Sequence, residues 1–91
     1  MKDSEKVELF LRKLQNHAEV KAKLYDGVDT DMPIDTALRY ATEELGEVAT
    51  AISRNRLNSV KDECIDLAHC AMLIFLSVDN FLDKQKDKDI F

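Results

Sequence analysis

The stretch ECIDLAHCAMLIFLSVDNFL, residues 63–82, decides the fold because it is apolar on nearly every side of a helix. It contains no Gly or Pro. Its apolar residues occur on all faces of the expected helix: Ile65, Leu67, Ala68, Ala71, Met72, Leu73, Ile74, Phe75, Leu76, Val78 and Phe81. A helix that is apolar on all sides has to be buried on all sides. Two other short helices cannot surround it, so we expect a partner subunit to complete the core.

The remaining sequence predicts two further helices and no strand. Residues 4–24 and residues 35–54 each place apolar side chains at helical spacing, and the third helix is expected over residues 59–84. Ser59 followed by Asp62 resembles a capping box, which predicts where the third helix begins. The chain therefore belongs to the all-α class.

Helix breakers are rare in the 91 residues, which contain two Gly and one Pro. The one segment rich in them is YDGVDTDMPID, residues 25–35. We predict a single domain over residues 1–91, an antiparallel helical bundle whose four-helix core forms by oligomerisation. The charged tail, residues 85–91, is expected to fray.

Composition narrows the function classes. The net charge of −5 and the pI of about 4.9 argue against nucleic-acid binding, which needs a basic face, but a bound cation would still permit a phosphate-bearing small molecule. The charged N-terminus does not resemble a signal peptide, and the longest apolar run, AMLIFL, is far shorter than a membrane span. On one helix Cys64 and Cys70 would lie about 9 Å apart, beyond disulfide reach, so we expect a reducing, cytoplasmic location.

Two acidic pairs stand on consecutive helices. Glu44 and Glu47 lie in ELGE, and Glu63 and Asp66 lie in ECID. In each pair the second carboxylate is one turn along and about 60° round the helix from the first. Because a short connection makes the two helices antiparallel, we expect the pairs to face each other across a groove.

Four neighbouring carboxylates need a counter-charge. Like charges a few ångströms apart raise a pKa, and a desolvated carboxylate without a partner is costly. The nearby bases Arg54, Arg56 and Lys61 lie at helix ends. A divalent cation would neutralise the site, and all-oxygen ligands favour Mg²⁺ or Mn²⁺.

The acidic residues also carry a family resemblance. EELGE, residues 43–47, is separated by fifteen residues from ECID, residues 63–66, and together they have the form Glu-Glu-x-x-Glu … Glu-x-x-Asp. Over residues 33–80 the chain resembles the MazG-like all-α nucleoside triphosphate pyrophosphatases. This resemblance implies Mg²⁺-dependent hydrolysis of NTPs or dNTPs between the α and β phosphates, giving a monophosphate and pyrophosphate. It also implies a homodimer or homotetramer and a role in nucleotide-pool housekeeping.

The resemblance assigns roles to single residues. It implies four metal ligands: Glu44, Glu47, Glu63 and Asp66. Glu43 would orient or deprotonate the attacking water, although simple solvation explains it equally well. Three further side chains are candidates for substrate contacts: Arg54, Asn80 and Lys84.

Other functions stay open at this stage. Phosphoribosyl-ATP pyrophosphohydrolase uses similar acidic helices, and a non-enzymatic helical interaction module would also carry acidic faces. A di-iron bundle needs Glu-x-x-His on two helices, whereas the sequence offers only Asp66-x-x-His69. We expect His69 to be a packing residue and His17 an exposed or rim residue. No P-loop motif is present.

Overall fold

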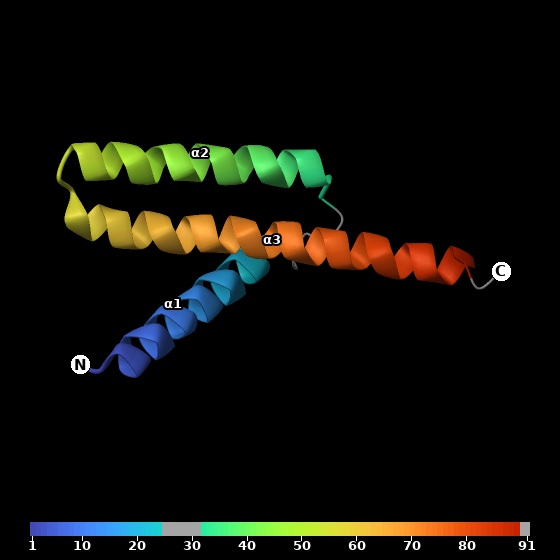
Figure 1. Cartoon of the computed structure of the whole chain (residues 1–91), viewed down its shortest axis with the longest axis horizontal. Coiled ribbons are helices and arrows are strands. Elements are labelled where there is room, and N and C mark those ends of the chain that lie inside the picture. The colour runs from blue at the N-terminus through green and yellow to red at the C-terminus, as the bar shows by residue number, and fades with distance from the viewer. Residues whose placement is uncertain (25–31, 90–91) are drawn as a thin grey trace.

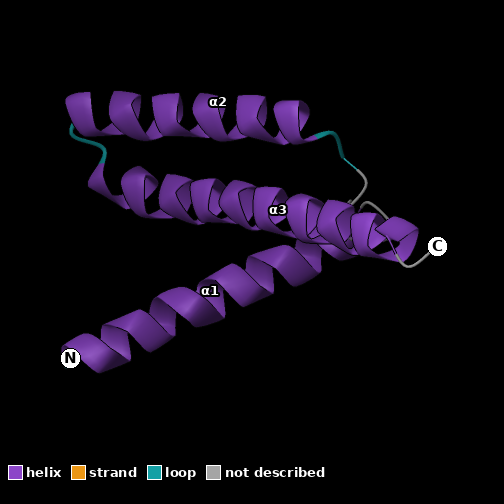
Figure 2. Ribbon diagram, turned by 45° about the vertical axis from the view of Figure 1, so that its right-hand side comes forward, coloured by secondary structure: helices purple, strands orange, loops and turns teal. Residues whose placement is uncertain are grey.

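The computed structural model describes residues 1–24 and 32–89, and these residues form three helices and no strand. They are α1 (Asp3–Leu24), α2 (Ile34–Ser53) and α3 (Leu57–Asp89). α2 and α3 run antiparallel and lie side by side, while α1 crosses α3 on the side away from α2 (Figures 1 and 2). The prediction of an all-α helical bundle is confirmed.

A tight turn joins α2 to α3 and makes them antiparallel. The Arg56 N–H donates to the Ala51 carbonyl at 2.9 Å, and the Asn55 N–H donates to the Ile52 carbonyl at 3.0 Å. Asn55 has a φ of 54°, a left-handed conformation that Asn tolerates better than most residues. These are the hydrogen bonds of a Schellman motif, which ends α2 and lets α3 begin at Leu57, two residues after Asn55.

The helix ends differ from those predicted. α3 begins at Leu57, so the expected capping box is wrong and Ser59 lies inside the first turn. Its first turn is closed by a backbone hydrogen bond from Val60 to the Arg56 carbonyl instead. At the other end α3 continues to Asp89, so residues 85–89, which were expected to fray, are helical. Gln85 and Lys86 are good helix formers, and positive charge near a helix C-terminus is favourable.

α2 packs on α3 through small residues. Its buried residues are Ala37, Val48 and Ala51, which are 1%, 8% and 7% exposed. Together with the half-buried residues Ala41 and Glu44 they repeat every three or four positions, so they form the face of α2 that packs on α3. Alanines at this contact let the two backbones approach closely, and Glu44 stands among them.

The helical spacing of the sequence predicts a different apolar face for α2, centred about 70° away on the helical wheel. That predicted face consists of Leu38, Ala41, Leu45, Val48, Ala49 and Ile52. Three large members of that face are exposed in the single chain: Leu38, Leu45 and Ile52. We call these three residues the outer stripe. Val48 and Ala41 belong to both faces, so the prediction was right about part of the contact and wrong about its centre. The small residues let the backbones of α2 and α3 approach closely, so they form the contact between the two helices. The longer side chains of the outer stripe are left exposed.

The chain on its own is too extended to cover its apolar surface. Its radius of gyration is 15.7 Å, against about 12 Å expected for a compact chain of this length. Its accessible surface is 7126 Å², whereas a compact protein of 10.4 kDa exposes about 5400 Å². Phe75 is 69% exposed at the middle of α3, and no described residue of α1 is buried. The accessible surface thus exceeds that of a compact protein by roughly 1700 Å², which is comparable to one subunit's share of an obligate interface.

α3 also meets the length and composition criterion for a membrane-spanning helix over Leu57–Lys86, with only 6% of its most apolar window buried inside the chain. The longest uninterrupted apolar run of α3, AMLIFL, is short, but an 18-residue window of the helix is apolar on average and contains no more than two charged residues. Core helices of soluble proteins meet the same criterion. The observation is therefore weak evidence for a membrane, and it emphasises how little of α3 the chain itself covers.

Candidate metal centre

Three carboxylates meet between α2 and α3. Glu44 comes from α2, and Glu63 and Asp66 come from successive turns of α3. One carboxylate oxygen of each residue lies within 4.8 Å of the others, and all three side chains are half-buried. The antiparallel turn therefore brings together three of the four residues for which the sequence predicted a shared site.

Two oxygens of this centre lack a donor. Glu44 Oε2 and Glu63 Oε2 are buried, and neither accepts a hydrogen bond from any residue that the structure describes. A buried acceptor without a partner costs about 1–3 kcal/mol, and more when it is charged. The centre offers only carboxylate oxygens, which accept hydrogen bonds and do not donate them. Oxygen atoms of this kind are the ligands that a hard divalent cation prefers.

The crowded carboxyls hold protons more tightly than usual. Burial raises the pKa of Glu44 from 4.5 to about 7, and the charges of Glu47 and Asp66 add to the effect. The pKa of Glu63 is also raised, chiefly because its protonated form hydrogen-bonds to Glu47, and next because of burial. An ionised carboxylate only accepts hydrogen bonds, so the hydrogen bonds of Glu47 with Glu44 and Glu63 exist only while one carboxyl group of each pair is protonated. Without a cation, the centre therefore retains protons near neutral pH.

The cation-free chain is expected to lose stability as pH rises from about 5 to about 8. Because the pKa of Glu44 is higher in the folded chain than its ordinary value of 4.5, the folded state binds more protons in this window and the free energy of unfolding falls with rising pH. The whole shift corresponds to about 3 kcal/mol, which solvent screening at a half-buried site reduces to about 1–2 kcal/mol. Urea unfolding in EDTA across this range measures the slope. A free energy that stays flat or rises would contradict the prediction.

The other two predicted catalytic acids lie outside the group of three carboxylates. Glu47 is exposed and interacts with Glu44 and Glu63, but its oxygens are not within the group of three. Glu43 is exposed too, and its charge contributes to the raised pKa of Cys70, whose first cause is burial. Glu47 therefore borders the centre on its solvent side, whereas Glu43 interacts with Cys70, which lies one turn after Asp66. The raised pKa keeps the Cys70 thiol protonated, which agrees with a packing role.

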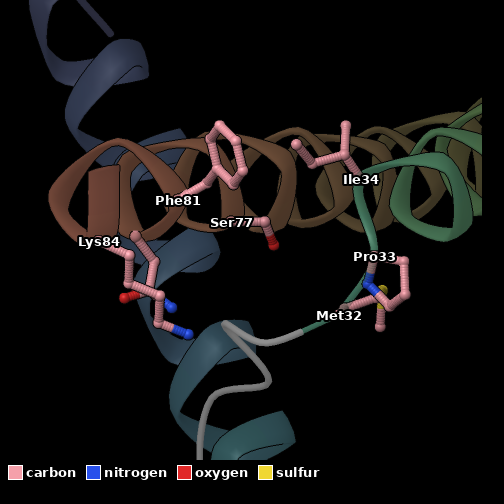
Figure 3. Close-up of a pocket in the computed structure, with 7 residues that line it drawn as sticks. Met32, Pro33, Ile34, Ser77, Phe81 and Lys84 are labelled. Carbon is pink, nitrogen blue, oxygen red and sulfur yellow. The ribbon is translucent and has the colours of Figure 1, made fainter. Parts of the chain in front are cut away.

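The predicted substrate residues do not gather at the three carboxylates of their own chain. Arg54 is exposed at the end of α2, one turn from where α3 begins. Asn80 lies fourteen residues after Asp66, which is about 21 Å along α3. With Lys84 it lines a separate pocket of about 220 Å³ where α2 begins, shown in Figure 3. The other residues that line this pocket are Met32, Pro33, Ile34, Ser77 and Phe81.

The sequence predicted only an exposed or rim position for His17, and no role at the candidate metal centre. From α1, His17 Nε2 lies 3.3 Å from Asp66 Oδ1, and its ring meets the ring of His69 edge to face, with centroids 5.0 Å apart. Burial lowers the pKa of His69, and the positive charges of His17 and Lys21 lower it further. The signal in the sequence was the spacing of His17 from Leu14 and Lys21, which places all three on the half-buried face of α1. His69 does not belong to the group of three carboxylates, so a di-iron arrangement gains no support.

The comparisons with known proteins add no relatives: no protein-family model, curated protein or solved structure matches the chain.

Proposed function

We propose that this chain is an Mg²⁺-dependent nucleoside triphosphate pyrophosphohydrolase, with Mn²⁺ as an alternative cation, similar to the MazG-like enzymes that its acidic motif resembles. The observation that carries the proposal is the convergence of Glu44, Glu63 and Asp66 from two helices, with two buried oxygens lacking donors. Acidic residues that only solvate a helix surface point outward, whereas Glu44 stands among the alanines that pack on α3.

The residues present fit a hard cation. Glu44, Glu63 and Asp66 would hold it through oxygen atoms, and Glu47 would add charge at the solvent side. Mg²⁺ binds few carboxylates and keeps other positions for water and substrate phosphates. When bound, it supplies neutralisation of the phosphate charge, which is the main requirement of phosphoryl-transfer chemistry. The net negative charge of the chain would otherwise repel a triphosphate.

In the proposed reaction, water adds across the anhydride between the α and β phosphates. The water oxygen bonds to phosphorus, the bridging P–O bond breaks, and the products are a nucleoside monophosphate and pyrophosphate. Glu43 is the proposed acceptor of the water proton, because it is exposed and its charge reaches Cys70, one turn after Asp66. A positioned carboxylate of this kind contributes typically 10²–10⁴-fold to a rate.

We propose further that the enzyme is a homodimer or homotetramer in the cytoplasm and serves nucleotide-pool housekeeping. The large uncovered surface of α2 and α3 supports the oligomer, since exposed apolar area of this size marks an interaction surface. Arg54, Asn80 and Lys84 lie far from the centre along their own chain. In an assembly they would contact the phosphates or base of a nucleotide held by a neighbouring subunit.

A panel of NTPs and dNTPs tests the proposal. Each nucleotide is incubated with the purified chain and Mg²⁺ or Mn²⁺, and products are resolved by ion-exchange chromatography. We expect a monophosphate and pyrophosphate, and not a diphosphate and inorganic phosphate. Including phosphoribosyl-ATP in the panel separates the rival pyrophosphohydrolase activity from nucleotide hydrolysis. The proposal fails if every nucleotide stays intact with both cations.

A further inference from the structure

α1 is attached to the rest of the chain by a narrow half-buried face. It contacts α3 but not α2 within the described residues, and none of its residues is buried. The half-buried residues in its C-terminal half are Leu14, His17, Ala18, Lys21 and Ala22. Two small alanines and one leucine bury little area, so polar contacts contribute much of what fixes α1 in place.

His17 makes the polar contact that reaches the candidate metal centre. Its Nε2 atom lies 3.3 Å from Asp66 Oδ1, and the two side chains are 21% and 39% exposed. The His69 ring stands at 75° to the His17 ring with centroids 5.0 Å apart, which is the edge-to-face geometry of favourable ring pairs. Two contacts in different directions therefore hold the imidazole plane, so His17 presents Nε2 to Asp66 in a fixed direction.

Asp66 is the carboxylate of the centre that most needs such a support. Glu44 and Glu63 each have one oxygen buried between α2 and α3, whereas the Asp66 side chain is 39% exposed. A carboxylate that is only partly buried samples several rotamers, and fixing it at the moment of cation binding costs conformational entropy. A contact that fixes it beforehand removes part of that cost.

We propose that His17 is a positioning residue of the metal centre, which holds the Asp66 carboxylate with one oxygen toward α1 and leaves its other lone pairs for the cation. The inference rests on the proposed function, since it assigns His17 a role toward that cation. In this role Nε2 carries its hydrogen and points it at Oδ1. Partners of this kind, which orient a metal ligand without touching the metal, typically change metal affinity 10–100-fold when removed.

The same contact links the docking of α1 to occupancy of the centre. If docked α1 increases cation affinity, then the cation must stabilise docked α1 by the same factor. We therefore expect amide exchange in the C-terminal half of α1 to slow when Mg²⁺ or Mn²⁺ is added. The N-terminal half, which has fewer half-buried residues, should respond less.

Mn²⁺ titration of the full-length protein, followed by the EPR signal of free Mn²⁺, tests the inference. His17→Ala should weaken Mn²⁺ binding about 10–100-fold. His17→Gln should restore most of the affinity, because its amide nitrogen takes the place of Nε2. Gln15→Ala is the matched control, since Gln15 bonds to Glu19 on the exposed side of α1, and it should bind as the wild type does. Circular dichroism confirms that each variant is folded.

The outcomes separate this inference from the proposed function. His17→Ala binding Mn²⁺ as tightly as the wild type would overturn the positioning role, and so would equal weakening in folded His17→Ala and His17→Gln. Amide exchange in α1 that ignores the cation would overturn the linkage. Wild type that binds no Mn²⁺, or Asp66→Asn that binds it undiminished, would overturn the metal centre itself and the role of His17 with it.

Discussion

Replacing Glu44 by Gln is expected to lower Mg²⁺-dependent pyrophosphate release by more than about 100-fold, above the usual cost of losing an indirect partner of a metal ligand. The amide keeps the shape of the side chain among the alanines of α2 but removes the charge that the cation needs. The same substitution should stabilise the cation-free chain by about 1–2 kcal/mol at about pH 8, because Glu44 would otherwise be ionised and desolvated there. Coupled pyrophosphate assays and urea unfolding measure the two effects.

Opposite signs in the two measurements distinguish a metal ligand from a structural residue. A Glu44 that only supports the fold would lose activity and stability together when replaced. Asp62→Asn is the matched control, because Asp62 is exposed and lies one residue before Glu63, so it should change neither quantity appreciably. Full activity in Glu44→Gln, with Asp62→Asn equally active, would rule out Glu44 as a metal ligand. A wild type that releases no pyrophosphate with Mg²⁺ would instead favour the helical interaction module.

The helices were predictable because their signals are local. The apolar periodicity gave three helices, and the Asn at position 55 suits the left-handed residue that ends α2. The packing face of α2 was not predictable in the same way. The helical wheel identifies where large apolar residues gather, around Leu45, but the contact with α3 uses small residues such as Ala37 and Ala51. How closely two backbones approach depends on the side chains of both helices. The apolar pattern of α2 alone therefore does not predict which of its faces contacts α3.

Part of the candidate centre was predictable because it, too, depends on a local signal. Pairs of acids three residues apart share a helix face whatever the tertiary structure, so Glu63 and Asp66 could be grouped from sequence. Which member of the α2 pair lies deepest depends on how α2 is rotated against α3, and the structure places Glu44 rather than Glu47 within the group. His17 could not be assigned, because its place beside Asp66 depends on how α1 crosses α3.

The outer stripe raises the question of what covers it. Leu38, Leu45 and Ile52 are 56%, 56% and 57% exposed and recur every seven residues, so they form one continuous line on α2. The apolar residues of α3 that face away from α2, such as Phe75, remain uncovered as well. A second copy of the chain offers the same line and the same α3 surface, and a symmetric dimer buries a self-complementary patch twice.

Replacing Leu38 and Leu45 together by Asp is therefore expected to dissociate the assembly and to lower its unfolding free energy by more than about 3 kcal/mol, since burying one leucine contributes about 1.5–3 kcal/mol. Light scattering gives the mass, and urea unfolding at matched concentration gives the stability. Val20→Asp is the control, because Val20 is equally exposed at 56% but lies on α1, and it should leave the mass unchanged. A double variant with the wild-type mass and stability would show that the outer stripe is not an interface. A wild type that remains monomeric in buffer would rule out the oligomer, whereas a wild type that needs detergent to stay in solution would assign the exposed surface of α3 to a membrane.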